Sequence, residues 1–171
     1  VEKEIDKLTS IDVDTKVFEG IYKDSTEVKK IFEKGYETAY KKTNRQTYQA
    51  MEAFIHNLNT MHSRAGAQIP FSSLNYGTDT SPEGRLVMKN LLYATERGLG
   101  NGETPIFPIQ IFKVKEGVNY NPEDKNYDLY KLSMRVSAKR LFPNFSFIDA
   151  PYNLQYYKPG HPETEVAYMG C

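Results

Sequence analysis

The feature that most constrains the fold is an alternation, after residue 66, of short apolar runs with stretches whose apolar residues recur at helical spacing. A short apolar run bounded by Gly or Pro is typical of a strand that is covered on both faces. Strands that alternate with helices pack as crossover units on a parallel sheet. The sequence therefore predicts an α/β fold with strands over Ala67–Tyr76, Thr104–Phe112 and Phe145–Ile148, and helices over Ser81–Gly98 and Asp128–Leu141.

The clearest local signal is the start of the first of these helices. Ser81 can cap it, Pro82 suits its first position, and Gly98 follows its last periodic residue. Two earlier helices are predicted over Ser25–Tyr40 and Arg45–His62, the second with Thr43 or Asn44 as its cap. The residues Val1–Asp24 fit a helix or a loop.

The last residues, Ala150–Cys171, form neither pattern for long. We expect a long loop that returns through a short strand near Val166–Tyr168. Loops of this length in a compact domain are usually functional or disordered.

Composition excludes several classes of function. The 22 Lys and Arg balance 22 Asp and Glu, so the chain lacks the basic field that nucleic-acid binding needs. It also lacks the roughly 18 consecutive apolar residues of a membrane-spanning helix. A single cysteine, Cys171, permits no internal disulfide and favours a reducing, cytoplasmic compartment.

The candidate chemistry lies at the carboxyl ends of the predicted strands, where Asn75, Gln110 and Asp149 stand. Ligands bind at that edge of a parallel sheet, although capping a loop is the commoner role for such residues. His56 and His62 are six residues apart, a spacing that does not stack them on one helix face, so no metal site is expected. Taken alone, Cys171 is either an incidental thiol or a reactive one at a loop tip.

Four strings remove much of this ambiguity. Residues 49–81, 98–121, 137–153 and 163–171, which include GLGNGETPIFPIQIF and ETEVAYMGC, closely resemble the anaerobic, oxygen-sensitive ribonucleoside triphosphate reductases. The resemblance is strong over residues 45–171 and looser before them.

The resemblance implies a ten-stranded β/α barrel made of two parallel half-barrels around a finger loop. We expect residues 1–171 to be a single partial catalytic domain. In it, residues 1–66 are mainly helical and form a candidate dimer or effector region, 67–149 are a strand-helix-strand half-barrel, and 150–171 are the finger loop. In the family, a thiyl radical on the finger-loop cysteine removes the 3′ hydrogen of the ribose, and the string YMGC assigns that role to Cys171.

The resemblance also implies substrate contacts, with Met169 and Gly170 beside the cysteine and Ser72, Ser73 and Asn75 in the pocket. It implies a glycyl radical and a structural zinc site in parts of the family's chain that lie outside this sequence, so neither is expected to be bound here. The expected partners are a ribonucleoside triphosphate, nucleotide effectors, formate as reductant, an iron-sulfur S-adenosylmethionine activating enzyme and a second copy of the chain. The alternative is a non-catalytic α/β module that binds nucleotides or another protein.

Overall fold

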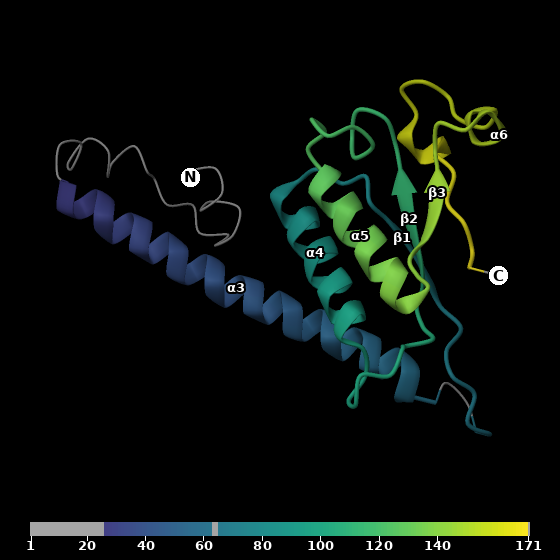
Figure 1. Cartoon of the computed structure of the whole chain (residues 1–171), viewed down its shortest axis with the longest axis horizontal. Coiled ribbons are helices and arrows are strands. Elements are labelled where there is room, and N and C mark those ends of the chain that lie inside the picture. The colour runs from purple at the N-terminus through teal and green to yellow at the C-terminus, as the bar shows by residue number, and fades with distance from the viewer. Residues whose placement is uncertain (1–25, 63–64, 171) are drawn as a thin grey trace. The chain divides into compact units, whose positions relative to one another are not determined.

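The computed structural model describes residues 26–62 and 65–170 (Figure 1). The chain divides into two compact units, Val1–Gln46 and Thr47–Cys171. The described part of the first unit belongs to helix α3 (Thr26–Thr60), which ends in the second unit. The prediction for Val1–Asp24 lies outside the described residues.

Helix α3 corrects the expectation of two separate helices. The chain stays helical from Thr26 to Thr60, through the positions where a new cap was expected. Neither Gly nor Pro lies between Tyr40 and Arg45. Thr43 and Asn44 therefore cost the helix only their modest propensity and do not end it.

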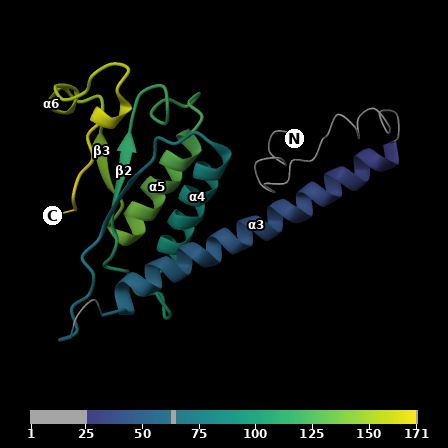
Figure 2. The same ribbon diagram turned by 180° about the vertical axis from the view of Figure 1, so that it is seen from behind.

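The second unit is built on a three-stranded parallel sheet in the order β1-β2-β3. Its strands are β1 (Ser73–Tyr76), β2 (Ile109–Val114) and β3 (Asn144–Phe147). Helices α4 (Pro82–Arg97) and α5 (Tyr127–Arg140) make the two crossovers. They lie side by side on one face of the sheet (Figures 1 and 2). The predicted α/β fold with a parallel sheet is therefore confirmed.

The core lies between this sheet face and the helices. Alternate residues of a strand point to opposite faces, and Phe112 and Val114 of β2 point toward Met88 of α4 and Leu129 of α5. A second cluster joins Ile55, in the part of α3 that belongs to this unit, to Leu91 and Ala94 of α4. The first cluster packs β2 against both helices, and the second packs α3 against α4.

The ends of α4 follow the sequence signals. Ser81 is the N-cap and its Oγ accepts a hydrogen bond from the Gly84 N–H at 3.0 Å, with Pro82 in the first turn. Gly98 ends the helix at φ 84°, a conformation that favours glycine. The predicted bounds of α4 are confirmed.

The final residues contain helix α6 (Pro151–Leu154) and a short 3-10 helix, η1 (Pro162–Thr164). The expected strand near Val166–Tyr168 is wrong, because residues 166–168 form no regular backbone ladder. The Tyr168 backbone is instead bound by the side chain of Asn75. No helix among the described residues is long and apolar enough to cross a membrane.

Candidate functional site

The sheet face that α4 and α5 leave uncovered is largely polar. The strand residues that alternate with the core residues are Ser73, Asn75, Ile109, Ile111, Lys113, Asn144 and Ser146. Five of these seven side chains are polar or charged. A face covered only by packed helices would be apolar, so this composition indicates a face that binds something else.

We define the terminal segment as residues 165–170. It lies along this polar face and runs opposite to β2, because Glu165 contacts Lys113 near the end of β2 whereas Gly170 contacts Ile109 at its start. Figures 1 and 2 show it on the side of the strands away from α4 and α5. The segment therefore places Gly170 at the start of β2, the central strand of the sheet.

Asn75 holds the terminal segment through two hydrogen bonds to one residue. Its Nδ2 donates to the Tyr168 carbonyl oxygen at 2.7 Å, and its Oδ1 accepts from the Tyr168 N–H at 2.9 Å. An amide side chain that pairs with both backbone groups replaces the partner strand that the segment lacks. The Tyr168 hydroxyl also donates to Oδ1 of Asn153, whose Nδ2 donates to the Phe147 carbonyl oxygen at 2.7 Å.

Gly170 lies against β2 at a distance that only glycine permits. A Cβ built at Gly170 would be 2.6 Å from both Cβ and Cγ2 of Ile109. The absence of a side chain lets the backbone lie directly on the strand.

Glu165 anchors the start of the terminal segment. Its carboxylate accepts from Lys113 Nζ at 3.0 Å and from Lys115 Nζ at 2.8 Å, and its side chain is 13% exposed. Desolvation acts to raise the pKa of Glu165, but the hydrogen bonds and charges of Lys115 and Lys113 outweigh it, so the pKa is lowered from its usual value. The hydrogen bond to Glu165 also raises the pKa of Lys115.

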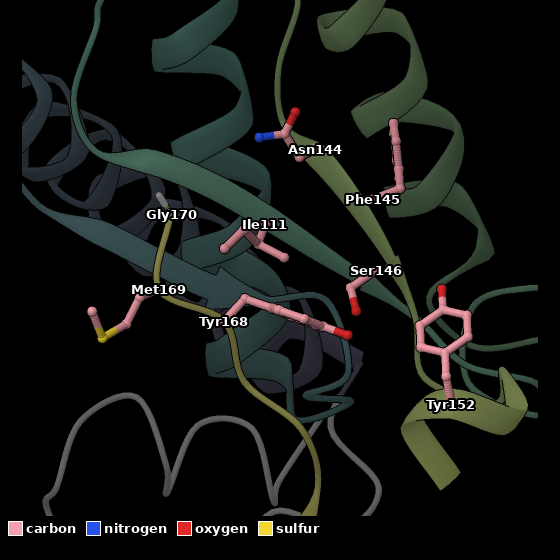
Figure 3. A pocket seen from close by; sticks show the side chains of 8 residues that line it. All are labelled: Ile111, Asn144, Phe145, Ser146, Tyr152, Tyr168, Met169 and Gly170. Atoms are coloured by element: carbon pink, nitrogen blue, oxygen red, sulfur yellow. The ribbon is translucent and has the colours of Figure 1, made fainter.

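A hollow of about 490 Å³ opens between the terminal segment and β3 (Figure 3). The Tyr168 side chain extends toward Ser146 and Tyr152, whereas Met169 points away from them. Ser146 is only 7% exposed, and its Oγ has no hydrogen-bond partner among the described residues. The lining consists of Ile111, Asn144, Phe145, Ser146, Tyr152, Tyr168, Met169 and Gly170 and contains no charged side chain.

The structure brings together some of the sequence-predicted site residues. Met169 and Gly170 line the hollow, and Asn75 binds the residue before them. Ser73 is exposed at the start of β1, and Ser72 Oγ makes only a long 3.4 Å contact with the Pro70 carbonyl oxygen. Neither serine lines the hollow.

The predicted catalytic residue, Cys171, lies outside the described residues. The described chain ends one residue earlier, at Gly170. No described residue contradicts its proposed role, which stays a prediction.

The two other strand-end candidates have structural roles. Gln110 is buried on the helix side, where its Oε1 accepts from the Tyr76 hydroxyl at 2.7 Å and its Nε2 donates to Thr95 Oγ1 at 2.8 Å. Burial raises the pKa of Tyr76 above its usual range, so the phenol stays a neutral donor. Asp149 accepts from the Glu116 N–H at 2.6 Å and caps a loop.

Sequence reasoning missed the residues that hold the terminal segment in place. Glu165, Lys113 and Lys115 form its ion-pair anchor, and Asn153 accepts a hydrogen bond from the Tyr168 hydroxyl. Charged and amide residues of this kind occur throughout the sequence. Their pairing depends on the path of the chain, and no local signal would have identified it.

The side chains that could ligate a metal are dispersed in the described part of the chain. No three or more His, Cys, Asp or Glu residues gather there to hold an ion. The zinc site that the sequence resemblance implies therefore has no fitting ligand set among these residues.

Comparisons with known proteins point to one family. A family model described as anaerobic ribonucleoside-triphosphate reductase matches residues 9–171. The anaerobic ribonucleoside-triphosphate reductase of Enterobacteria phage T4 is 37% identical over 134 residues, which cover 78% of this chain and 21% of that protein. The proteins of the same description from Haemophilus influenzae and Escherichia coli are 36% and 34% identical over 58% and 62% of this chain. The matches cover only 14% and 15% of those two proteins, so the chain spans at most about a fifth of its relatives' length.

Proposed function

The chain belongs to the anaerobic ribonucleoside-triphosphate reductase family, and on this premise we propose that it forms the part of such an enzyme that presents Cys171 to the ribose of a ribonucleoside triphosphate. The observation that carries the proposal is the terminal segment. It is held on the polar sheet face at Glu165, Tyr168 and Gly170, and the next residue is the only cysteine of the chain.

The proposed step is the transfer of one hydrogen atom. A thiyl radical at Cys171 Sγ forms an S–H bond while the ribose C3′–H bond breaks homolytically, which leaves the unpaired electron on C3′. Atoms and electrons balance, and no proton is released. The glycyl radical that the family carries, outside this chain, would supply the oxidising equivalent by taking the hydrogen atom of the thiol.

A hydrogen-atom transfer depends on the close approach of the sulfur and the C3′ hydrogen more than on charged groups around them. The reacting atoms must lie near van der Waals contact, in a site from which water is excluded. The uncharged lining of the hollow, with Tyr152, Tyr168 and Met169, supports this chemistry better than phosphate binding, which needs cations or free N–H groups. We assign the ribose end of the substrate to this side of the sheet, with Met169 and Gly170 as contacts. Ser73 and Asn75 of β1, and Ser72 just before it, are proposed as further contacts.

The remaining parts of the proposal follow from family membership. The substrate is a ribonucleoside triphosphate, the reductant is formate, and nucleotide effectors regulate the enzyme. An iron-sulfur S-adenosylmethionine enzyme activates a cytoplasmic homodimer. The complete ten-stranded barrel would continue the three-stranded sheet beyond β3, and the helical residues before 67 would contribute to the dimer or effector region.

The test replaces Cys171 with serine in the intact, activated enzyme. Serine is nearly the same size, but its O–H bond is too strong for a glycyl radical to break, so packing stays nearly constant while the hydrogen-atom step is lost. We expect normal glycyl radical content by electron paramagnetic resonance, normal nucleotide binding and no deoxyribonucleotide product. Cys171→Ala is the second variant, because it removes any hydrogen bond that serine could add.

Normal product yield from either variant would overturn the proposal and favour the alternative of a non-catalytic nucleotide-binding module. Loss of nucleotide binding together with activity would show that Cys171 acts on the fold and would also contradict the assigned role. Radical content and product must be measured on the same sample, since a loss of radical alone would lower the yield.

A further inference from the structure

We infer that Asn75 is a positioning residue for the hydrogen-atom step and acts by fixing the backbone of Tyr168, three residues before Cys171. This inference rests on the proposed function and adds a residue to it. This role is separate from a substrate contact. The Asn75 amide uses one N–H and one oxygen lone pair to bind Tyr168, and its second N–H and second lone pair could still bind substrate.

The geometry singles out Asn75 among the contacts of the terminal segment. Glu165 is held by two flexible lysine side chains, which tolerate small displacements. Asn75 stands on a strand whose backbone is paired with β2, and its short side chain has few rotamers. Two hydrogen bonds to the N–H and C=O of one residue fix both the place and the direction of the chain at Tyr168.

The position of Asn75 in the strand register explains why its side chain can reach the backbone of Tyr168. Asn75 is paired with Ile111 across the sheet, and Ile111 is 6% exposed although α4 and α5 cover only the other face. The residues of the terminal segment that line the hollow with Ile111 are Tyr168, Met169 and Gly170. The segment therefore passes directly over the β1-β2 pair, where an Asn side chain of β1 can reach its backbone.

Holding Tyr168 also sets the path of the residues that follow. Gly170 is two residues further on and rests on Ile109, with no space for a Cβ. The chain is thus held on both sides of Met169. Because a displacement of about 1 Å can cost roughly a hundredfold in rate, a loosened Tyr168 would slow the transfer without removing any reacting group.

The experiment compares Asn75→Ala and Asn75→Asp with a matched control in the intact, activated enzyme. Asp keeps an acceptor for the Tyr168 N–H but loses the donor to its carbonyl oxygen, so it should fall between wild type and Ala. The control is Asn59→Ala. Asn59 also holds a loop backbone, with Nδ2 donating to the Phe107 carbonyl oxygen at 2.6 Å and Oδ1 accepting from the Ile106 N–H at 2.7 Å, but it does not contact the terminal segment.

Three quantities are measured on each variant: kcat per glycyl radical, KM for the ribonucleotide, and the hydrogen-exchange rate of the Tyr168 amide. For Asn75→Ala we expect kcat to fall about ten- to a hundredfold, with KM unchanged within about twofold and faster exchange at Tyr168. For Asn59→Ala we expect faster exchange at Ile106 and Phe107 but wild-type exchange at Tyr168.

The outcomes separate this inference from the proposed function. A rise in KM with unchanged kcat and exchange would overturn the positioning role and leave Asn75 as a substrate contact only. A lower kcat with unchanged Tyr168 exchange would overturn it too, since Asn75 would then act on the substrate directly. If Asn75→Ala keeps full activity while Cys171→Ser is inactive, the positioning role fails and the proposed function stands, whereas an active Cys171→Ser enzyme removes the proposed function itself.

Discussion

The two faces of the three-stranded sheet are held by different forces. On the helix face, Phe112 and Val114 are buried among apolar residues of α4 and α5. On the opposite face, Asn75 and Lys113 hold the terminal segment through hydrogen bonds and an ion pair. Apolar burial is strong and non-directional, whereas hydrogen bonds fix position but contribute little net stability. The difference suggests that the helix face stabilises the fold, whereas the polar face positions the terminal segment.

The largest effect is expected from truncating the centre of the helix face. Phe112 is fully buried, and its ring packs at centroid distances of 5.5 Å from Tyr76, 6.1 Å from Phe145 and 6.2 Å from Tyr130. Phe112→Ala should lower the free energy of unfolding of this unit by about 3–5 kcal/mol, because it removes apolar contacts and leaves a cavity. Native-state hydrogen exchange of the β2 amides in the intact protein measures this change.

Phe71→Ala is the matched control, since the Phe71 side chain is 63% exposed and makes an edge contact with Phe107. It should cost about 1 kcal/mol or less. Equal costs for the two variants would mean that the helix face is not the stabilising side of the sheet, and the comparison of the two faces would fail.

The helix face is also the part that the sequence predicts well. The start of α4 depends on Ser81 and Pro82, and the strands depend on short apolar runs, so each signal lies within a few residues. One strand boundary differs from its prediction because of prolines. The strand predicted over Thr104–Phe112 forms only at Ile109–Val114, because Pro105 and Pro108 cannot donate to a ladder.

The polar face could not be predicted in the same way. Asn75 and Tyr168 are 93 positions apart, and nothing near either residue signals the contact. Asn75 was found as a candidate because it ends a strand, but the sequence gives no sign that its amide binds backbone. Gly170 shows the same limit, since the need for glycine arises from the approach of Ile109 and not from a turn.

A smaller effect on stability, but a large one on rate, is expected at Gly170. In Gly170→Ala the new methyl group would overlap Ile109, so the terminal segment must move away from β2. We expect kcat per radical to fall about ten- to a hundredfold, while exchange of the β2 core amides stays near wild type. Steady-state kinetics of the activated enzyme and hydrogen exchange on the same preparation check both parts.

Gly100→Ala is the control for Gly170, because a Cβ there meets no atom within 4 Å. It should leave both the rate and the exchange pattern unchanged. If Gly170→Ala instead slowed catalysis no more than Gly100→Ala, close packing of the terminal segment on the polar face would not matter for the rate. The polar face would then have no demonstrated role in catalysis.

The smallest effect is expected at the ion-pair anchor, and it depends on pH. Because the pKa of Glu165 is lowered in the folded protein, its contribution to stability is fully present above the usual glutamate pKa. That contribution is lost as pH falls through the lowered value. At neutral pH, Glu165→Gln should weaken attachment of the terminal segment by about 1 kcal/mol, a typical size for a partly exposed ion pair. Hydrogen exchange of residues 165–168 in wild type and variant should differ at pH 7 and converge as the solution is acidified below about pH 4.

The control for this last effect is Glu163→Gln. Glu163 pairs with His161 at 2.8 Å, but both side chains are more than 60% exposed, so its removal should leave the exchange of residues 165–168 unchanged at every pH. A difference between wild type and Glu165→Gln that persisted undiminished in acid would show that the side chain acts through its shape and not its charge. The anchor on the polar face would then resemble the packing of the helix face, and the contrast between the two faces would rest on Asn75 and Gly170 alone.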